Sequence, residues 1–140
     1  MPMHISWYDD AQTIIICTGE GRWTWEEFHD GSLRAVEMMN TVNHRVDLIY
    51  DRRPGSYPPR GNGLLHYKQA YQRMPEHAGM HVFVGSMSMI IQVTMNLFFR
   101  MYGRTVDPEL EGRFVVADSA EGAVALIKKD RASVAVPAND

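Results

Sequence analysis

Cysteine is nearly absent from this sequence, because Cys17 is the only one among 140 residues. A single thiol excludes both an internal disulfide and a zinc site built from several cysteines. Cys17 lies in the apolar stretch TIIICT. We therefore expect a buried and unreactive thiol, because apolar surroundings disfavour the thiolate form.

The sequence also lacks a long hydrophobic run and an excess of basic charge. Its most apolar segment, residues 86–103, is interrupted by Gln92, Thr94 and Asn96, and a membrane span needs about 20 apolar residues without such breaks. The net charge of −3 argues against general nucleic-acid binding, which usually needs a basic face. Residues 1–10 have neither a basic start nor an apolar run, so we expect no signal peptide and a cytoplasmic protein.

Recognisable catalytic, cofactor and metal motifs are missing as well. The stretch GEGRW, residues 19–23, lacks the third glycine of a dinucleotide-binding loop. His77 and His81 have the spacing of helical metal ligands, but the surrounding PEHAGMH leads into a predicted strand, so we expect no metal site. Histidine is a common acid or base in catalysis, but no serine or cysteine nucleophile stands in a motif with His66. We therefore expect a protein without catalysis and without a cofactor.

The composition is that of one globular domain. Hydrophobic residues make up 45% of the chain and charged residues 22%, which is an ordinary balance for a soluble protein. The length also fits a single domain. We expect this domain to span residues 1–130, followed by a flexible tail at 131–140, where the hydrophobic residues show no period.

Hydrophobic periodicity predicts strands alternating with helices. Strands are expected at 4–8, 13–18, 45–50, 80–85 and 113–117, the first two forming a hairpin. Helices are expected at 24–42, 62–74, 86–103 and 119–129. The order β-β-α-β-α-β-α-β-α predicts an α/β fold with a mixed, mainly parallel sheet and helices packed on it.

The first helix has the clearest start signal in the sequence. Thr24 is followed three residues later by Glu27, which is the spacing of a capping box. Apolar residues recur on one predicted face of this helix, namely Trp25, Phe28, Ala35, Val36 and Met39. Gly31 weakens the middle of the helix but need not end it.

This order of elements resembles that of the STAS domain superfamily, which includes the anti-sigma-factor antagonists and the SpoIIAA-like bacterial proteins. The most suggestive segments are GRWTWEEF, RVDLIYD and FVVADSAEGAVALI, and the likeness runs from about Ile5 to Lys129. The resemblance implies a non-enzymatic module that binds partner proteins and sometimes small ligands. The antagonists carry an Asp-Ser-Ser-Gly element after the third strand. This chain has DRRPGSYPPRGNGLLHY there, with Ser56 on the loop, so we do not expect their phosphorylation switch.

The loop after the third predicted strand carries three arginines among prolines and glycines. In open α/β sheets, ligands meet the chain at the carboxyl ends of the strands. We therefore predict that an anion binds there to Arg52, Arg53, Arg60 and Ser86, because guanidinium groups hold carboxylates and phosphates with two parallel hydrogen bonds. The alternative is that the arginines are solvated or paired with carboxylates such as Asp51, which contributes little.

The predicted helix at 86–103 is apolar around most of its circumference, so it should be buried on more than one side. One hypothesis is a two-fold homodimer interface formed by Met87, Met89, Ile90, Val93, Leu97 and Met101. Two alternatives stay open. The segment is an ordinary core helix, or its flexible methionines line a pocket for an apolar ligand.

Taken together, these features predict a bacterial, cytoplasmic, STAS-like regulatory or protein-interaction module that forms a homodimer and has a regulatory partner protein. The alternative is a small-ligand-binding protein that recognises an anionic or lipid-like ligand at the carboxyl ends of the strands. An enzyme that uses His66 is the least favoured of the three.

Overall fold

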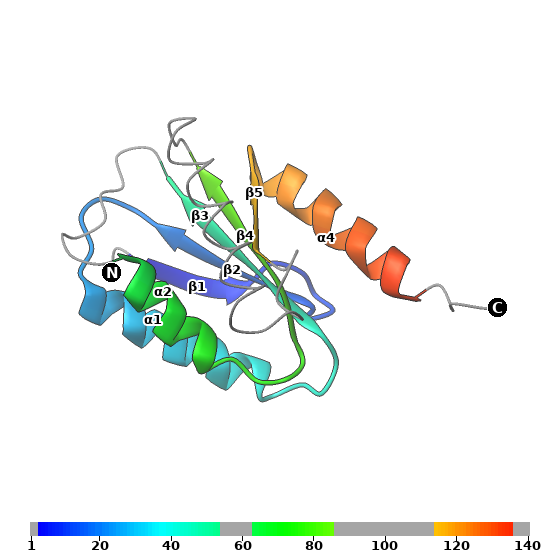
Figure 1. Ribbon diagram of the computed structural model, residues 1–140, viewed down its shortest axis with the longest axis horizontal. Helices are drawn as coiled ribbons and strands as arrows, with labels where there is room; N and C mark the ends of the chain where they lie inside the picture. The colour runs from blue at the N-terminus through cyan, green and yellow to red at the C-terminus, as the bar shows by residue number, and fades with distance from the viewer. Residues whose placement is uncertain (1–2, 54–62, 86–113, 136–140) are drawn as a thin grey trace.

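A computed structural model describes residues 3–53, 63–85 and 114–135 (Figure 1). The described part of the chain forms a five-stranded sheet and three helices. The strands are β1 (Met3–Trp7), β2 (Ile14–Gly19), β3 (Val46–Arg52), β4 (Ala78–Gly85) and β5 (Phe114–Ala117). The helices are α1 (Trp25–Met39), α2 (Gly63–Gln72) and α4 (Ala120–Ala135). The predicted α/β class is confirmed.

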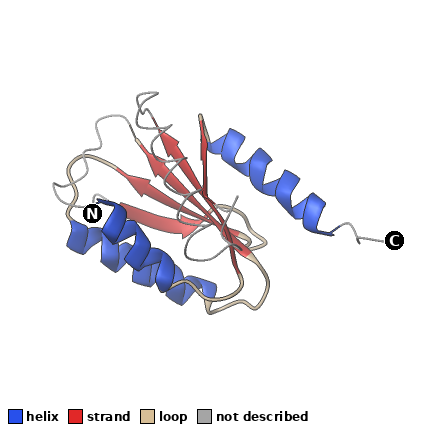
Figure 2. Cartoon of the chain, in the orientation of Figure 1, coloured by secondary structure: helices blue, strands red, loops and turns tan. Residues whose placement is uncertain are grey.

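The strands follow one another across the sheet in the order β1-β2-β3-β4-β5. β1 pairs with β2 in the antiparallel direction, and all the other neighbours are parallel, so the predicted hairpin and mainly parallel sheet are confirmed. Because the steps from β2 to β3 and from β3 to β4 run in the same direction, right-handed crossovers place α1 and α2 on one face. α4 lies on the opposite face (Figure 2).

Each face of the sheet has its own hydrophobic cluster, because side chains alternate along a strand. The residues buried on the α1 face are Ile5, Ile15, Cys17, Ala35, Met39, Val46, Leu48 and Ala78. Those on the α4 face are Ile14, Ile49, Met80, Val82, Val84, Ala117, Ala123 and Ile127. The central strands contribute to both clusters, which explains why β3 and β4 are continuous apolar runs in the sequence.

α1 begins as its sequence predicts. The hydroxyl of Thr24 accepts a hydrogen bond of 3.0 Å from the Glu27 backbone N–H, and the Thr24 backbone N–H donates to the Glu27 carboxylate at 3.1 Å. Phe28, together with Ala35 and Met39, is buried. Gly31 does not end the helix. A Cβ atom there would lie only 3.3 Å from Cδ1 of Ile5, so glycine permits the close approach of α1 to β1.

A network of buried charge joins the sheet to α4 at the amino ends of the parallel strands. The carboxylate of Asp47 in β3 is completely buried and accepts hydrogen bonds from Arg45 Nη2 at 2.9 Å and from the Met80 backbone N–H at 2.6 Å. Its other oxygen accepts from Arg131 Nη2 at 2.6 Å. The same Arg131 nitrogen donates to the carbonyl of Thr13 at 2.7 Å. The network thus ties β3, β4 and the segment before β2 to the last helix.

The end of the chain differs from the prediction. We expected a tail from residue 131, but α4 continues to Ala135. The hydrophobic period fails there because the inward-facing residue of this turn, Arg131, is held by Asp47 and Thr13 rather than by apolar contacts. A search of the hydrophobic pattern alone cannot find such a turn.

Several predicted features lie outside the described residues. These are the helix at 86–103 with its interface candidates Met87, Met89, Ile90, Val93, Leu97 and Met101, the loop residues Ser56 and Arg60, and Ser86. Among the helices that the structure describes, none has the length and apolar character needed to cross a bilayer.

Candidate anion-binding edge

The parallel strands β2, β3 and β4 end side by side at one edge of the sheet, which we call the carboxyl edge. The strand register aligns Gly19, Arg52 and Gly85 in one row across this edge. Arg52 therefore has a glycine as its neighbour on each side. Among these three residues, only Arg52 has a side chain.

Position 85 requires glycine, because its backbone lies very close to Arg52. It has a φ of +147°, which residues with a side chain rarely adopt. A Cβ atom at this position would lie 2.8 Å from both the Cβ and the carbonyl oxygen of Arg52. Glycine at the end of β4 thus permits a close approach of the two strand ends, in which Arg52 packs against the backbone of Gly85.

Arg53 extends the edge by one residue. Its backbone N–H donates to the Gly19 carbonyl at 3.1 Å, so the β2–β3 ladder continues past the end of β3. Its guanidinium Nε lies 3.4 Å from the Asp51 carboxylate, and the Arg53 side chain is 56% exposed while that of Asp51 is 12% exposed. A pair this exposed contributes about 0–1 kcal/mol to stability. Arg53 is therefore paired with a carboxylate, as the alternative interpretation of the arginine loop expected.

Helix starts surround the same edge. α1 begins after β2 and α4 begins after β5, so the positive ends of both helix dipoles point to the carboxyl edge. Ser119 caps α4, because its hydroxyl accepts a hydrogen bond of 3.0 Å from the Gly122 N–H. Glu20 follows β2 and Asp118 follows β5 at this edge. Together with Asp51, these acids partly offset the positive charge. The edge is therefore mixed in charge, and Arg52 and Arg53 are its basic centre.

Two of the four residues predicted to bind an anion lie among the described residues. Arg52 and Arg53 lie at the carboxyl edge, next to the end of β4. Arg60 and Ser86 lie outside the described residues. The pairing of β3 with β4 was the premise of the prediction, and this premise is confirmed.

The two histidines with metal-ligand spacing have separate surroundings. His77 Nε2 contacts the carbonyl of Met39 at 2.8 Å, whereas His81 lies within β4 and is buried beside Tyr50. His77 precedes β4 and His81 lies within it, so the two do not stand on successive turns of a helix. In the ranges that the structure describes, no group of three or more histidines, cysteines or acidic residues could hold a metal ion.

Cys17 is the buried thiol that the sequence predicts. Its side chain belongs to the cluster beneath α1. Burial raises the pKa of this thiol to about 12, so the nucleophilic thiolate is not formed near neutral pH.

A small hollow lies beside this thiol, between α1 and the sheet. Its lining is mostly apolar and includes Met3, Tyr50 and Met74, with the Ser32 hydroxyl at its side. The space open to the centre of a water molecule is about 10 Å³, which is room for about one water. This hollow is too small for a lipid-like ligand.

A histidine pair was missed by the sequence analysis. His66 in α2 does not face open solvent but stacks on the indole of Trp25, with ring centroids 4.1 Å apart. Its Nδ1 lies 2.7 Å from Nε2 of His29 in α1. No local pattern predicts this contact, because the two residues are 37 positions apart and meet only when α1 and α2 pack together.

Comparison with known proteins identifies no relative, because no family model, curated protein or solved structure matches this chain. The candidate site must therefore be interpreted from its own geometry.

Proposed function

We propose that this protein is a non-catalytic α/β binding module that recognises a carboxylate or phosphate group at the carboxyl edge of its sheet. The observation that carries the proposal is the position of Arg52, which is the last residue of β3 and is paired with Gly19 on one side and Gly85 on the other. The likeness to STAS domains in the order of elements supports a regulatory or protein-interaction role for such a module.

The chemistry of Arg52 suits this role. A guanidinium group presents donors in a planar fork that matches the two oxygens of a carboxylate or phosphate. The glycines on either side carry no side chain that could pair with this guanidinium group. The starts of α1 and α4 add favourable dipole potential at the same edge. Arg53 supplies a second cation, and an incoming anion would compete with Asp51 for it.

Two observations favour binding over catalysis. The Cys17 thiol is held in its protonated form by burial, as its raised pKa indicates. Both ring nitrogens of His29 and one of His66 are engaged in side-chain contacts, which leaves His29 without a nitrogen for proton transfer to a substrate.

Thermal unfolding in the presence of inorganic phosphate, pyrophosphate and citrate tests the proposal. A bound anion should raise the melting temperature, because a ligand at 100 times its Kd stabilises the folded state by about 2.7 kcal/mol. The Arg52→Ala variant should lose this rise, and Arg52→Lys should keep only part of it, because lysine retains the charge without the fork.

Arg34→Ala is the matched control, since Arg34 is an exposed arginine on α1. It removes the same net charge and should leave the anion response unchanged. A panel without any effect on the wild-type chain, or an equal rise in Arg52→Ala, would contradict the proposal.

A homodimer through the segment at 86–103 is a further part of the proposal, and it is supported by the apolar pattern of Met87, Ile90, Leu97 and their neighbours. Light scattering should then give twice the mass of one chain. A monomer at high protein concentration would contradict the homodimer.

A further inference from the structure

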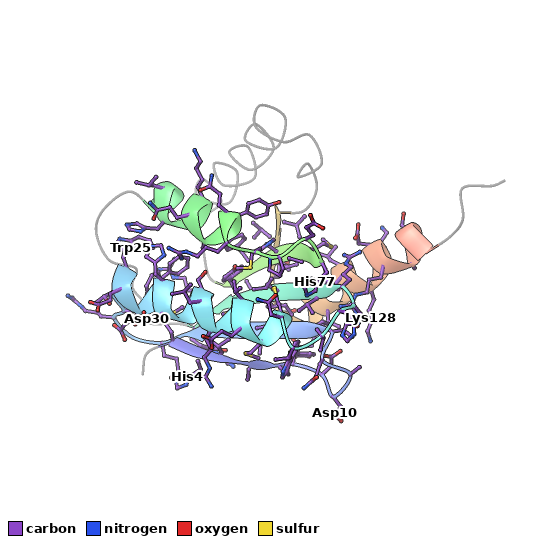
Figure 3. All side chains as sticks on the ribbon, turned by 90° about the horizontal axis from the view of Figure 1, so that it is seen from below. His4, Asp10, Trp25, Asp30, His77 and Lys128 are labelled. Atoms are coloured by element: carbon purple, nitrogen blue, oxygen red, sulfur yellow. The ribbon has the colours of Figure 1, made fainter. Side chains whose placement is uncertain are left out.

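α1 and α2 are joined by a chain of three basic side chains. Nη1 of Arg73, which follows α2, lies 2.8 Å from Nδ1 of His29 in α1. Nε2 of His29 in turn lies 2.7 Å from Nδ1 of His66 in α2. Trp25, which covers the other side of His66, marks this end of α1 in Figure 3.

This geometry permits one arrangement of protons. A guanidinium group only donates hydrogen bonds, so Nδ1 of His29 must be unprotonated to accept from Arg73. A neutral His29 then carries its proton on Nε2 and donates it to His66. Nδ1 of His66 must therefore also be unprotonated. Both histidines are neutral in the packed arrangement of α1 and α2.

An additional proton on either inner nitrogen breaks the chain. If it binds Nδ1 of His29, it faces an N–H of Arg73, and if it binds Nδ1 of His66, it faces the N–H of His29. In both cases two donors meet without an acceptor. The new positive charge also stands beside the permanent charge of Arg73.

We propose that the His29–His66 contact is a proton-sensitive latch, which holds α2 on α1 at neutral pH and releases it in mild acid. The latch closes over an apolar cluster, because α2 buries Ala70 against Trp23 and Phe28. Its release exposes this aromatic surface. The proposal is independent of anion binding at the carboxyl edge.

The groups around His29 oppose its protonation. Burial lowers the pKa of His29, and the nearby charge of Arg73 lowers it further. A proton on His66 would act in the same direction. Asp30, the neighbouring acid on α1, acts in the opposite direction but does not outweigh them.

The direction of the pH effect follows from this shift. An unpacked histidine binds a proton with a pKa of about 6.5. The released state therefore binds more protons than the closed state between pH 6.5 and the lower pKa of packed His29. The latch is fully closed above about pH 6.5 and loses stability as the pH falls below this value.

Hydrogen exchange at pH 7.5 and 5.5 tests the latch, with α4 amides as the internal reference. For one linked proton, the protection of α2 amides should fall by up to about tenfold between these two pH values, after correction for intrinsic exchange rates. α4 should change much less. His29→Gln and His66→Gln should each remove most of this difference, because glutamine forms hydrogen bonds but does not titrate in this range.

His4→Gln is the control, because His4 is an exposed histidine on β1 that lies away from α2, 3.9 Å from Glu20. It should keep the full pH response. Equal loss of protection in α2 and α4, or an unchanged response in His29→Gln and His66→Gln, would overturn the proposal. Nitrogen-detected NMR of the wild-type chain gives a test without any variant. His29 should be neutral at pH 7.5 with its proton on Nε2, and the other tautomer or an imidazolium would overturn the latch.

Discussion

The two ends of the parallel strands use charge in opposite ways. At the amino ends, Asp47 is fully buried, and the arginines that bind it, Arg45 and Arg131, are only 29% and 28% exposed. At the carboxyl edge, Arg53 is 56% exposed, and the acid beside it is a single carboxylate, Asp51. Charges that are enclosed and fully hydrogen-bonded hold the fold together. Charges that remain accessible are available to a ligand.

β4 shows the same contrast in its glycines. A side chain at Gly79, near its first residue, would overlap the Asp47 carboxylate and the Arg45 guanidinium. A side chain at Gly85, its last residue, would meet Arg52. The first glycine makes room for a closed network within the protein. The second permits the close approach of an arginine at the end of the neighbouring strand.

The sharpest test of this contrast is Asp47→Ala. It leaves the Met80 N–H without its acceptor and removes one carboxylate from Arg45 and Arg131, which keep Asp130 and Thr13 as their other partners. The free energy of unfolding should therefore fall by about 3 kcal/mol, the lower end of the range for breaking a buried ion pair. Arg52→Ala, at a half-buried position, should lower it by about 1 kcal/mol, the typical effect of a single substitution. Urea unfolding of both variants measures the difference. Similar losses in the two would mean that the carboxyl edge is also a structural network.

Gly85→Ala should have a smaller effect on stability. The substitution forces a side chain into a backbone conformation at φ +147° and against Arg52, and such strain costs about 1–3 kcal/mol. It should also weaken anion binding, because Arg52 must move. Urea unfolding and phosphate titration of the same variant separate the two effects. Full anion binding by a destabilised Gly85→Ala variant would show that the placement of Arg52 against Gly85 does not matter for the ligand.

The fold could be predicted largely from local patterns. Alternating and continuous apolar runs locate the five described strands, and the pair Thr24 and Glu27 locates the start of α1. These signals are local because they depend on the pleat of a strand or on the first turn of a helix. The apolar surroundings of Cys17 likewise predict its burial.

The contacts that matter most for function and stability could not be predicted in this way. The row of Gly19, Arg52 and Gly85 depends on strand register, which a single sequence does not reveal. The His29–His66 contact depends on how two helices pack. One clue was available, since Asp47 is an acid in the otherwise apolar run VDLIY, and a buried acid requires a partner.

The bond between Asp47 and Arg131 has a consequence for biosynthesis. The two residues are 84 positions apart, so the ribosome releases the acid long before the arginine that completes its set of partners. A nascent chain that has reached the end of β5 already contains the whole described sheet, yet one oxygen of its central carboxylate still lacks the guanidinium. The last helix therefore completes the buried network of the domain. A chain shortened before residue 131 would still contain all the described strands, but it would lack the hydrogen bonds from Arg131 to Asp47.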